Sequence, residues 1–141
     1  PLAEGILRSK LEQNAISTIT VDSAGTSNYH IGEHPDKRSI ENAASHGIDI
    51  SKLHARQFVQ KDFDEFSRIF VMDTSNYNDV LSLARTDEDK KKVSMILNIS
   101  HPNTNMSVPD PYFGGSQGFE NVFLLLEEAC ERIIEKIKVS Q

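Results

Sequence analysis

Hydrophobic residues recur at helical spacing at both ends of the chain. Near the start, apolar side chains at positions 2, 3, 6, 7 and 11 predict an amphipathic helix from Leu2 to about Asn14. A second helix is predicted from Gly118 to about Lys138. Its apolar stripe consists of Phe119, Val122, Phe123, Leu126, Cys130, Ile133 and Ile137.

Short apolar runs between these two segments predict strands. Residues 19–21, Ile-Thr-Val, form a β-branched run followed by a turn-rich segment. Residues 69–72, Ile-Phe-Val-Met, are continuously apolar, which is typical of a buried parallel strand. Residues 93–97 predict a further strand.

Helices are predicted between these strands. One runs from Asp36 to His46, with Gly47 at its C-terminal end, and another from Ser75 to Leu83. Strands that alternate with helices imply a single three-layer α/β domain with a mostly parallel sheet and helices on both faces. In such a domain the ligand site lies beyond the carboxyl ends of the strands.

The start of the chain suggests that an element precedes it. Pro1 stands in the first turn of the predicted helix, where proline is favoured, but no N-cap residue and no strand come before it. We expect a first strand and a phosphate loop upstream of Pro1, which would complete a four-stranded sheet. A strand, a loop and a helix N-terminus in that order form the common architecture of phosphate binding.

Composition and charge limit the function. The 141 residues are 38% hydrophobic and 26% charged, which predicts one globular domain over residues 1–141. The net charge of −6 argues against a nucleic-acid partner, and no apolar run approaches the roughly 18 residues of a membrane span. Because the single Cys130 cannot form an internal disulfide, we expect a reducing, cytoplasmic location.

The remaining polar residues suggest no cofactor. The five histidines and Cys130 do not form a recognisable set of metal ligands, so we predict no metal and no other cofactor. The charged run from Asp87 to Lys92 is interpreted as a solvated helical face. We expect the protein to be a monomer.

A series of short motifs resembles the low-molecular-weight protein tyrosine phosphatases from residue 1 to about residue 137. The most specific is Val108-Pro109-Asp110-Pro111-Tyr112-Phe113-Gly114-Gly115, which resembles the general-acid loop of that family. The others are Pro1-Leu2-Ala3-Glu4-Gly5, Asp22-Ser23-Ala24-Gly25-Thr26, His46-Gly47-Ile48-Asp49, Ala55-Arg56-Gln57 and Met72-Asp73-Thr74-Ser75-Asn76. The resemblance implies that phosphotyrosine-containing proteins are hydrolysed through a cysteinyl-phosphate intermediate, with inorganic phosphate as the product.

The catalytic loop of that family is absent from the chain. In the family, a Cys, five residues, an Arg and a Ser immediately precede the proline that matches Pro1. The Cys is the nucleophile, and the Arg holds the phosphate. We expect both residues upstream of Pro1, and we expect residues 1–141 alone to be inactive. Cys130, on the buried stripe of the last helix, is interpreted as a structural residue.

Asp110 is the predicted general acid and, later in the reaction, the base that activates water. A tyrosyl leaving group must be protonated as it departs. Pro109 and Pro111 restrict the backbone on both sides of Asp110, so the carboxyl group is carried on a stiff turn. Without the resemblance, the same three residues could simply form a turn.

Other site residues follow from the same resemblance. Tyr29, Tyr112 and Phe113 are predicted to form the aromatic walls of a slot for the phenyl ring, although they could be ordinary half-buried aromatics. Ser23 and Asn76 resemble residues that brace the phosphate loop, but both types are common in any loop.

Two acidic residues have a simpler interpretation. Asp73 resembles a family residue near the site, but it could equally cap the helix that follows. Glu4, in the first turn of the first helix, is interpreted as an ordinary helix-stabilising acid.

Two further functions stay open. An arsenate reductase on the same fold would need additional cysteines, and both the single Cys130 and the intact Asp110-Pro111-Tyr112 argue against it. A remnant that binds phosphate or phosphotyrosine without catalysis is the other alternative.

Overall fold

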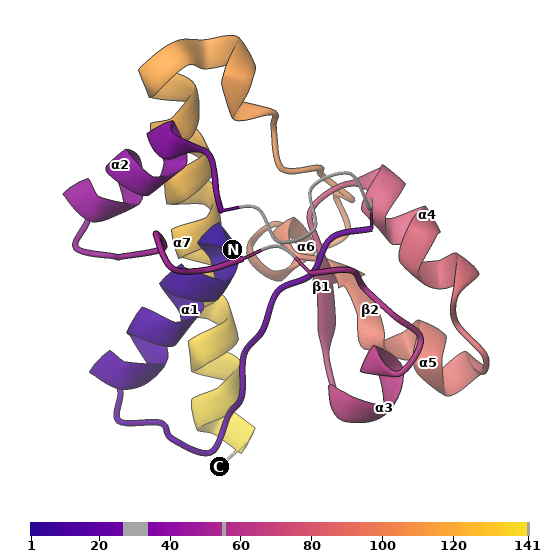
Figure 1. Cartoon of the computed structure of the whole chain (residues 1–141). Helices are drawn as coiled ribbons and strands as arrows, with labels where there is room; N and C mark the ends of the chain where they lie inside the picture. The colour runs from indigo at the N-terminus through magenta and orange to yellow at the C-terminus, as the bar shows by residue number, and fades with distance from the viewer. Residues whose placement is uncertain (27–33, 55, 141) are drawn as a thin grey trace.

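The computed structural model describes residues 1–26, 34–54 and 56–140. Along these residues, helices predominate over strands (Figure 1). The elements in order are α1 (Leu2–Gln13), α2 (Lys37–Ser45), α3 (Asp62–Glu65), β1 (Ile69–Val71), α4 (Thr74–Ser82), α5 (Asp87–Lys92), β2 (Val93–Met95), α6 (Leu97–Ser100), the 3-10 helix η1 (Pro111–Gly114) and α7 (Gly115–Ser140).

Strands β1 and β2 pair in parallel, as the sequence predicted. Ile69 lies opposite Val93, and Val71 lies opposite Met95. The connection between the strands contains α4 and α5. The second strand is shorter than predicted, because α6 already begins at Leu97.

The predicted strand at residues 19–21 is not a sheet strand among the described residues. No residue from 16 to 24 belongs to a strand, and only Gly25 forms an isolated parallel bridge, with Gln57. The Gly25 N–H donates to the Arg56 carbonyl at 2.7 Å. β-branched residues favour an extended backbone, but a ladder also needs a neighbouring strand. The described sheet therefore has two strands rather than the three expected within residues 1–141.

Helices cover both faces of this sheet, which confirms the layered α/β fold (Figure 1). On one side, α1, α2, α6 and α7 enclose a core that contains Ile6 and Phe123. On the other side, a second core includes Phe63 of α3 and Val80 of α4. Successive residues of β1 point to opposite faces. Phe70 accordingly packs against the first core, and Val71 belongs to the second.

The long C-terminal helix α7 starts earlier than predicted, at Gly115. Glycine is a poor helix former within a helix, as at Gly118, but close contact with η1 holds the first turn in place. Its predicted stripe is buried, including Phe123 and Cys130, except for the half-buried Ile137. Helix α1 packs along α7, and the Cys130 Sγ lies 3.9 Å from the Ala3 carbonyl oxygen.

The ends of α2 follow the signals in the sequence. The Asp36 carboxylate accepts a hydrogen bond of 2.8 Å from the Arg38 backbone N–H and so caps the helix. Gly47 follows the C-cap residue at a φ of 80°, a conformation that glycine adopts without strain.

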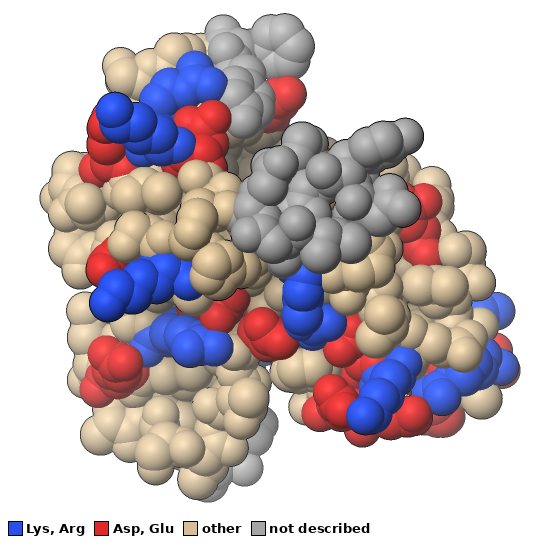
Figure 2. Space-filling model, viewed as in Figure 1, with Lys and Arg blue, Asp and Glu red and all other residues tan. Residues whose placement is uncertain are grey.

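Acidic and basic side chains are interspersed on the face seen in Figure 2. In the charged run of α5, Asp89 departs from the sequence interpretation, because it is only 5% exposed and accepts a 3.0 Å hydrogen bond from Arg85. The solvated-face prediction is therefore wrong for Asp89. None of the helices in the described ranges combines the length and the apolar character needed to cross a bilayer.

Candidate active site

Asp73 follows β1 directly and caps helix α4. Its Oδ1 accepts a hydrogen bond of 2.7 Å from the Asn76 backbone N–H. The cap satisfies one of the free N–H groups of the first helical turn. The helix-cap interpretation of Asp73 is therefore confirmed.

The Asn76 side chain connects α4 to the segment before residue 27. Its Nδ2 donates to the Thr26 Oγ1 at 3.2 Å. Thr26 in turn accepts, through its backbone carbonyl, a 3.2 Å hydrogen bond from the Gln57 side chain. Asn76 lies just beyond the carboxyl end of β1 and thus braces the turn that follows Ser23.

Ser23 is attached to the first turn of α1. Its hydroxyl donates to Glu4 Oε1 at 2.6 Å, and Arg8 lies 2.7 Å from Glu4 Oε2. Arg8 also donates to the Val21 carbonyl at 2.7 Å. Glu4 is only 6% exposed, so the interpretation as an ordinary helix-stabilising acid is incomplete. Its carboxylate holds residues 21–23 against α1.

A second ion pair fixes the opposite side of the same segment. The Arg56 guanidinium donates to Asp22 at 2.8 Å and to both carboxylate oxygens of Asp62, at 3.0 and 3.1 Å. Asp62 is 3% exposed and also accepts from the Val59 N–H. Hydrogen bonding to Asp62 raises the pKa of Arg56 above its usual value. The guanidinium therefore stays charged and keeps Asp22 in place.

The loop that carries Asp110 is anchored beside β1. The Val108 N–H donates to the Met72 carbonyl at 2.7 Å, and the Thr74 N–H donates to the Ser107 hydroxyl at 3.3 Å. Val108 also packs against the core shared by α1 and α7. Two residues later, Asp110 is exposed at the start of η1.

Gly118 permits the close packing of η1 on α7. A Cβ atom at this position would overlap the Pro111 carbonyl oxygen and lie 3.2 Å from its carbonyl carbon. Backbone atoms cannot move aside as a flexible side chain can. The absence of a side chain at Gly118 therefore determines where the turn after Asp110 lies.

The contacts connect Ser23 and Asn76 to the loop that carries Asp110. Glu4 is bonded to Ser23, and the turn after Ser23 is bonded to Asn76 of α4. The start of α4 is in turn bonded to the loop before Asp110. Tyr29 lies outside the described residues, as do the side chains of Tyr112 and Phe113. The aromatic slot therefore stays a prediction.

This arrangement agrees with a comparison to known families. The chain matches the low molecular weight phosphotyrosine protein phosphatase family over residues 1–141. It belongs to that family. The human low molecular weight phosphotyrosine protein phosphatase is 34% identical over 137 residues, which cover 96% of this chain and 86% of that protein.

Solved structures of this phosphatase family share the fold. A protein tyrosine phosphatase from Entamoeba histolytica has a TM-score of 0.90 at 33% identity, and the match covers 99% of this chain and 89% of that one. A Drosophila arginine phosphatase has a TM-score of 0.87 at 29% identity, covering 98% of this chain and 89% of the other. The fold is therefore shared by proteins named for two different phosphorylated residues.

Cys130 is not placed to serve as a catalytic nucleophile. Its side chain is 1% exposed, and burial raises the pKa of its thiol to about 12. A thiol with such a pKa is almost wholly protonated near neutral pH, whereas the reactive form is the thiolate. The structural interpretation of Cys130 is confirmed.

Sequence reasoning missed the buried polar contacts of the structure. Arg56 was noted only as part of a motif, and neither Asp62 nor Glu4 was expected to be buried. The signal in the sequence that could have indicated burial of Asp62 is its position in a segment with apolar neighbours. Among the residues that the structure describes, no cluster of three or more His, Cys, Asp or Glu side chains could hold a metal ion.

Proposed function

We propose that this protein hydrolyses phosphotyrosine in proteins through a cysteinyl-phosphate intermediate. Family membership supports phosphotyrosyl proteins as the substrate class. The nucleophilic cysteine and the phosphate-binding arginine stand upstream of Pro1, and residues 1–141 alone do not turn over substrate.

The anchored position of Asp110 is the observation that carries the proposal. Its loop is joined to the carboxyl end of β1 by the bond between Val108 and Met72. The same end of the domain holds the Asn76 contact to Thr26, and Ser23 connects it to the first turn of α1. An acid on one side and a helix N-terminus on the other suit a departing oxygen and a phosphoryl group.

The reaction has two steps. The cysteine thiolate forms a bond to phosphorus while the tyrosyl oxygen leaves and takes a proton from Asp110. The Asp110 carboxylate then takes a proton from water, whose oxygen attacks the cysteinyl phosphate. This step releases inorganic phosphate and restores the thiolate. The N–H groups at the start of α1 stabilise negative charge on the phosphoryl oxygens.

Replacement of Asp110 tests this role. The protein is produced with the segment that precedes Pro1 in its gene, and phosphate release is measured from a phosphotyrosyl peptide and from p-nitrophenyl phosphate. Asp110→Asn should lower kcat about a hundredfold or more for the peptide. The loss should be smaller for p-nitrophenyl phosphate, because p-nitrophenolate is the better leaving group and needs less protonation.

A charge-matched control and two other substrates make the result specific. Asp87→Asn removes an exposed carboxylate from α5 and should leave kcat unchanged. Equal turnover by wild type and Asp110→Asn would remove Asp110 from the mechanism. Phosphoarginine peptides hydrolysed faster than phosphotyrosine peptides would reassign the substrate, and arsenate reduction would reassign the reaction. Binding of the phosphotyrosyl peptide without turnover would leave the non-catalytic alternative.

A further inference from the structure

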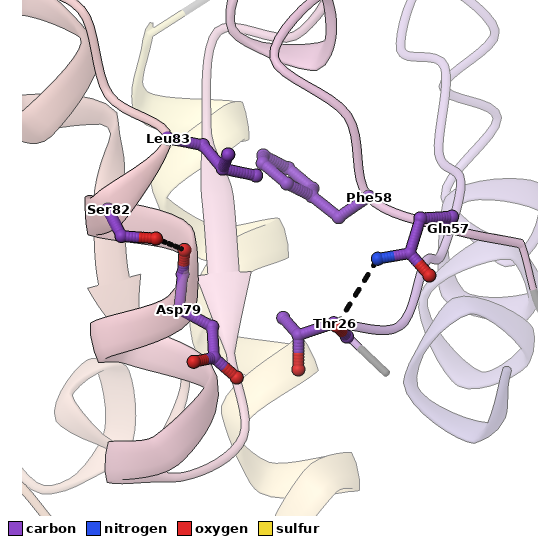
Figure 3. Close-up of a pocket in the computed structure, with 6 residues that line it drawn as sticks. All are labelled: Thr26, Gln57, Phe58, Asp79, Ser82 and Leu83. Carbon is purple, nitrogen blue, oxygen red and sulfur yellow. Dashed lines mark hydrogen bonds between the residues drawn. The ribbon is translucent and has the colours of Figure 1, made fainter. Parts of the chain in front are cut away.

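A hollow of about 300 Å³ lies beside the predicted site (Figure 3). Its wall is formed by α4, by the turn at Thr26 and by the segment after Arg56. The lining residues are Thr26, Gln57, Phe58, Asp79, Ser82 and Leu83. None of them has a role in the proposed phosphate chemistry.

Two polar side chains of the hollow already donate to neighbouring carbonyl groups. The Ser82 hydroxyl already donates to the Asp79 carbonyl at 2.6 Å, and the Gln57 amide nitrogen donates to Thr26 (Figure 3). The exposed Asp79 carboxylate forms no ion pair with any residue in the described part of the chain. A ligand with several N–H donors and a positive charge would pair with this carboxylate.

An apolar surface also lines the hollow. Phe58 is 8% exposed, and Leu83 is 37% exposed; both side chains line the hollow. In Figure 3 the two side chains point toward each other. A methylene chain could pack against them while its charged end reaches Asp79, as long basic side chains commonly do.

The hollow is continuous with the predicted site through Thr26. This residue lines the hollow and also accepts the hydrogen bond from Asn76. Asp79 lies one helical turn after Asn76 on α4, so both project from nearby positions of one face. A peptide held at the site by its phosphotyrosine can therefore present a neighbouring side chain to the hollow.

We propose that this hollow binds an arginine side chain of the protein substrate, close in sequence to the phosphotyrosine. The inference rests on the proposed phosphatase function and adds a substrate preference to it. Arginine is the best match because its guanidinium has five donors and no acceptor. The carboxylate of Asp79 supplies the opposite charge, and Phe58 and Leu83 contact the methylene stem.

Kinetics with matched peptides test the preference. The full-length protein is assayed on phosphotyrosyl peptides in which one arginine replaces alanine at successive positions before and after the phosphotyrosine. One position should raise kcat/KM about threefold, which is typical of a partly exposed ion pair. Asp79→Asn should abolish this gain, and Asp79→Lys should favour a glutamate at the same position. Asp87→Asn, with the same change of net charge outside the hollow, should keep the arginine preference.

The outcomes separate this inference from the proposed function. Turnover of p-nitrophenyl phosphate by wild type and by Asp79→Asn reports the phosphatase activity independently of any peptide. If that activity is present but arginine has no effect at any position, the hollow is not a substrate subsite. An arginine preference that survives in Asp79→Asn, or is lost equally in Asp87→Asn, would also overturn the assignment.

Binding can be measured without turnover. In the isotopically labelled protein, N-acetylarginine amide should shift the backbone amide signals of Thr26, Gln57 and Ser82 more than N-acetylalanine amide does. Asp79→Asn should remove this difference. Equal shifts with both compounds would contradict the inference even if the phosphatase activity were demonstrated.

Discussion

The Ser23 hydroxyl donates a hydrogen bond of 2.6 Å to the Glu4 carboxylate, which is almost completely buried. This contact joins the end of an extended segment to the first turn of α1. Arg8 contacts the other oxygen of Glu4, so the carboxylate stays paired although it is shielded from water. The relative position of α1 and residues 21–23 therefore depends on one buried acid.

Ser23→Ala should lower the free energy of unfolding by about 1 to 2 kcal/mol, because a hydrogen bond to a buried charge is lost. Glu4 keeps its contact with Arg8, so the fold should be retained. Urea denaturation measures the change. Ser45→Ala is the matched control, since Ser45 is an exposed serine that bonds only within α2. Equal changes in the free energy of unfolding for the two substitutions would show that the buried contact stabilises the fold no more than the exposed one.

Gly118→Ala should reduce catalysis more than stability alone would explain. The new methyl group would push the Pro111 carbonyl away and displace the turn next to Asp110. A displacement of about 1 Å at a reacting group can cost up to about a hundredfold in rate, so we expect at least about a tenfold loss of kcat/KM. The measurement compares peptide hydrolysis at a temperature where thermal unfolding shows both variants to be folded.

Gly114→Ala provides the control for this prediction, because a Cβ atom at Gly114 would meet no atom within 4 Å. Its activity should stay close to that of the wild type. Wild-type kcat/KM in Gly118→Ala would mean that the Pro111 turn adjusts without moving Asp110.

The contact between His46 and Glu120 should make stability depend on pH in the acidic range. The hydrogen bond from His46, at 2.7 Å, and a second from Asn42 lower the pKa of Glu120 below its usual value. A carboxylate with a lowered folded-state pKa stabilises the protein above its unfolded pKa. This stabilisation is lost as the pH falls through the folded value.

Glu120→Gln tests this dependence. Relative to wild type, the variant should be destabilised near pH 7, and the difference should shrink as the pH is lowered below the ordinary range of a glutamate. Urea denaturation at several pH values measures it. A difference that is constant with pH would exclude the Glu120 charge as its source.

Local signals predicted most of the helices and the class of the fold. The capping residues of α2 and the apolar stripe of α7 each depend on neighbouring positions in the sequence, so they could be identified directly. The β1 strand was found for the same reason. Residues 19–21 were predicted wrongly, because pairing depends on a partner strand that local sequence does not specify.

The same distinction between local signals and long-range contacts applies to the candidate site. The sequence by itself determined which residue types are available, including Asp110 between two prolines and Cys130 on an apolar stripe. Only the tertiary structure decided that Glu4 is buried against Ser23 and that Asn76 reaches Thr26. The physical reason is that burial and ion pairing depend on which chain segments packing brings together. The separation of two residues along the sequence does not indicate whether they lie close together in the folded protein.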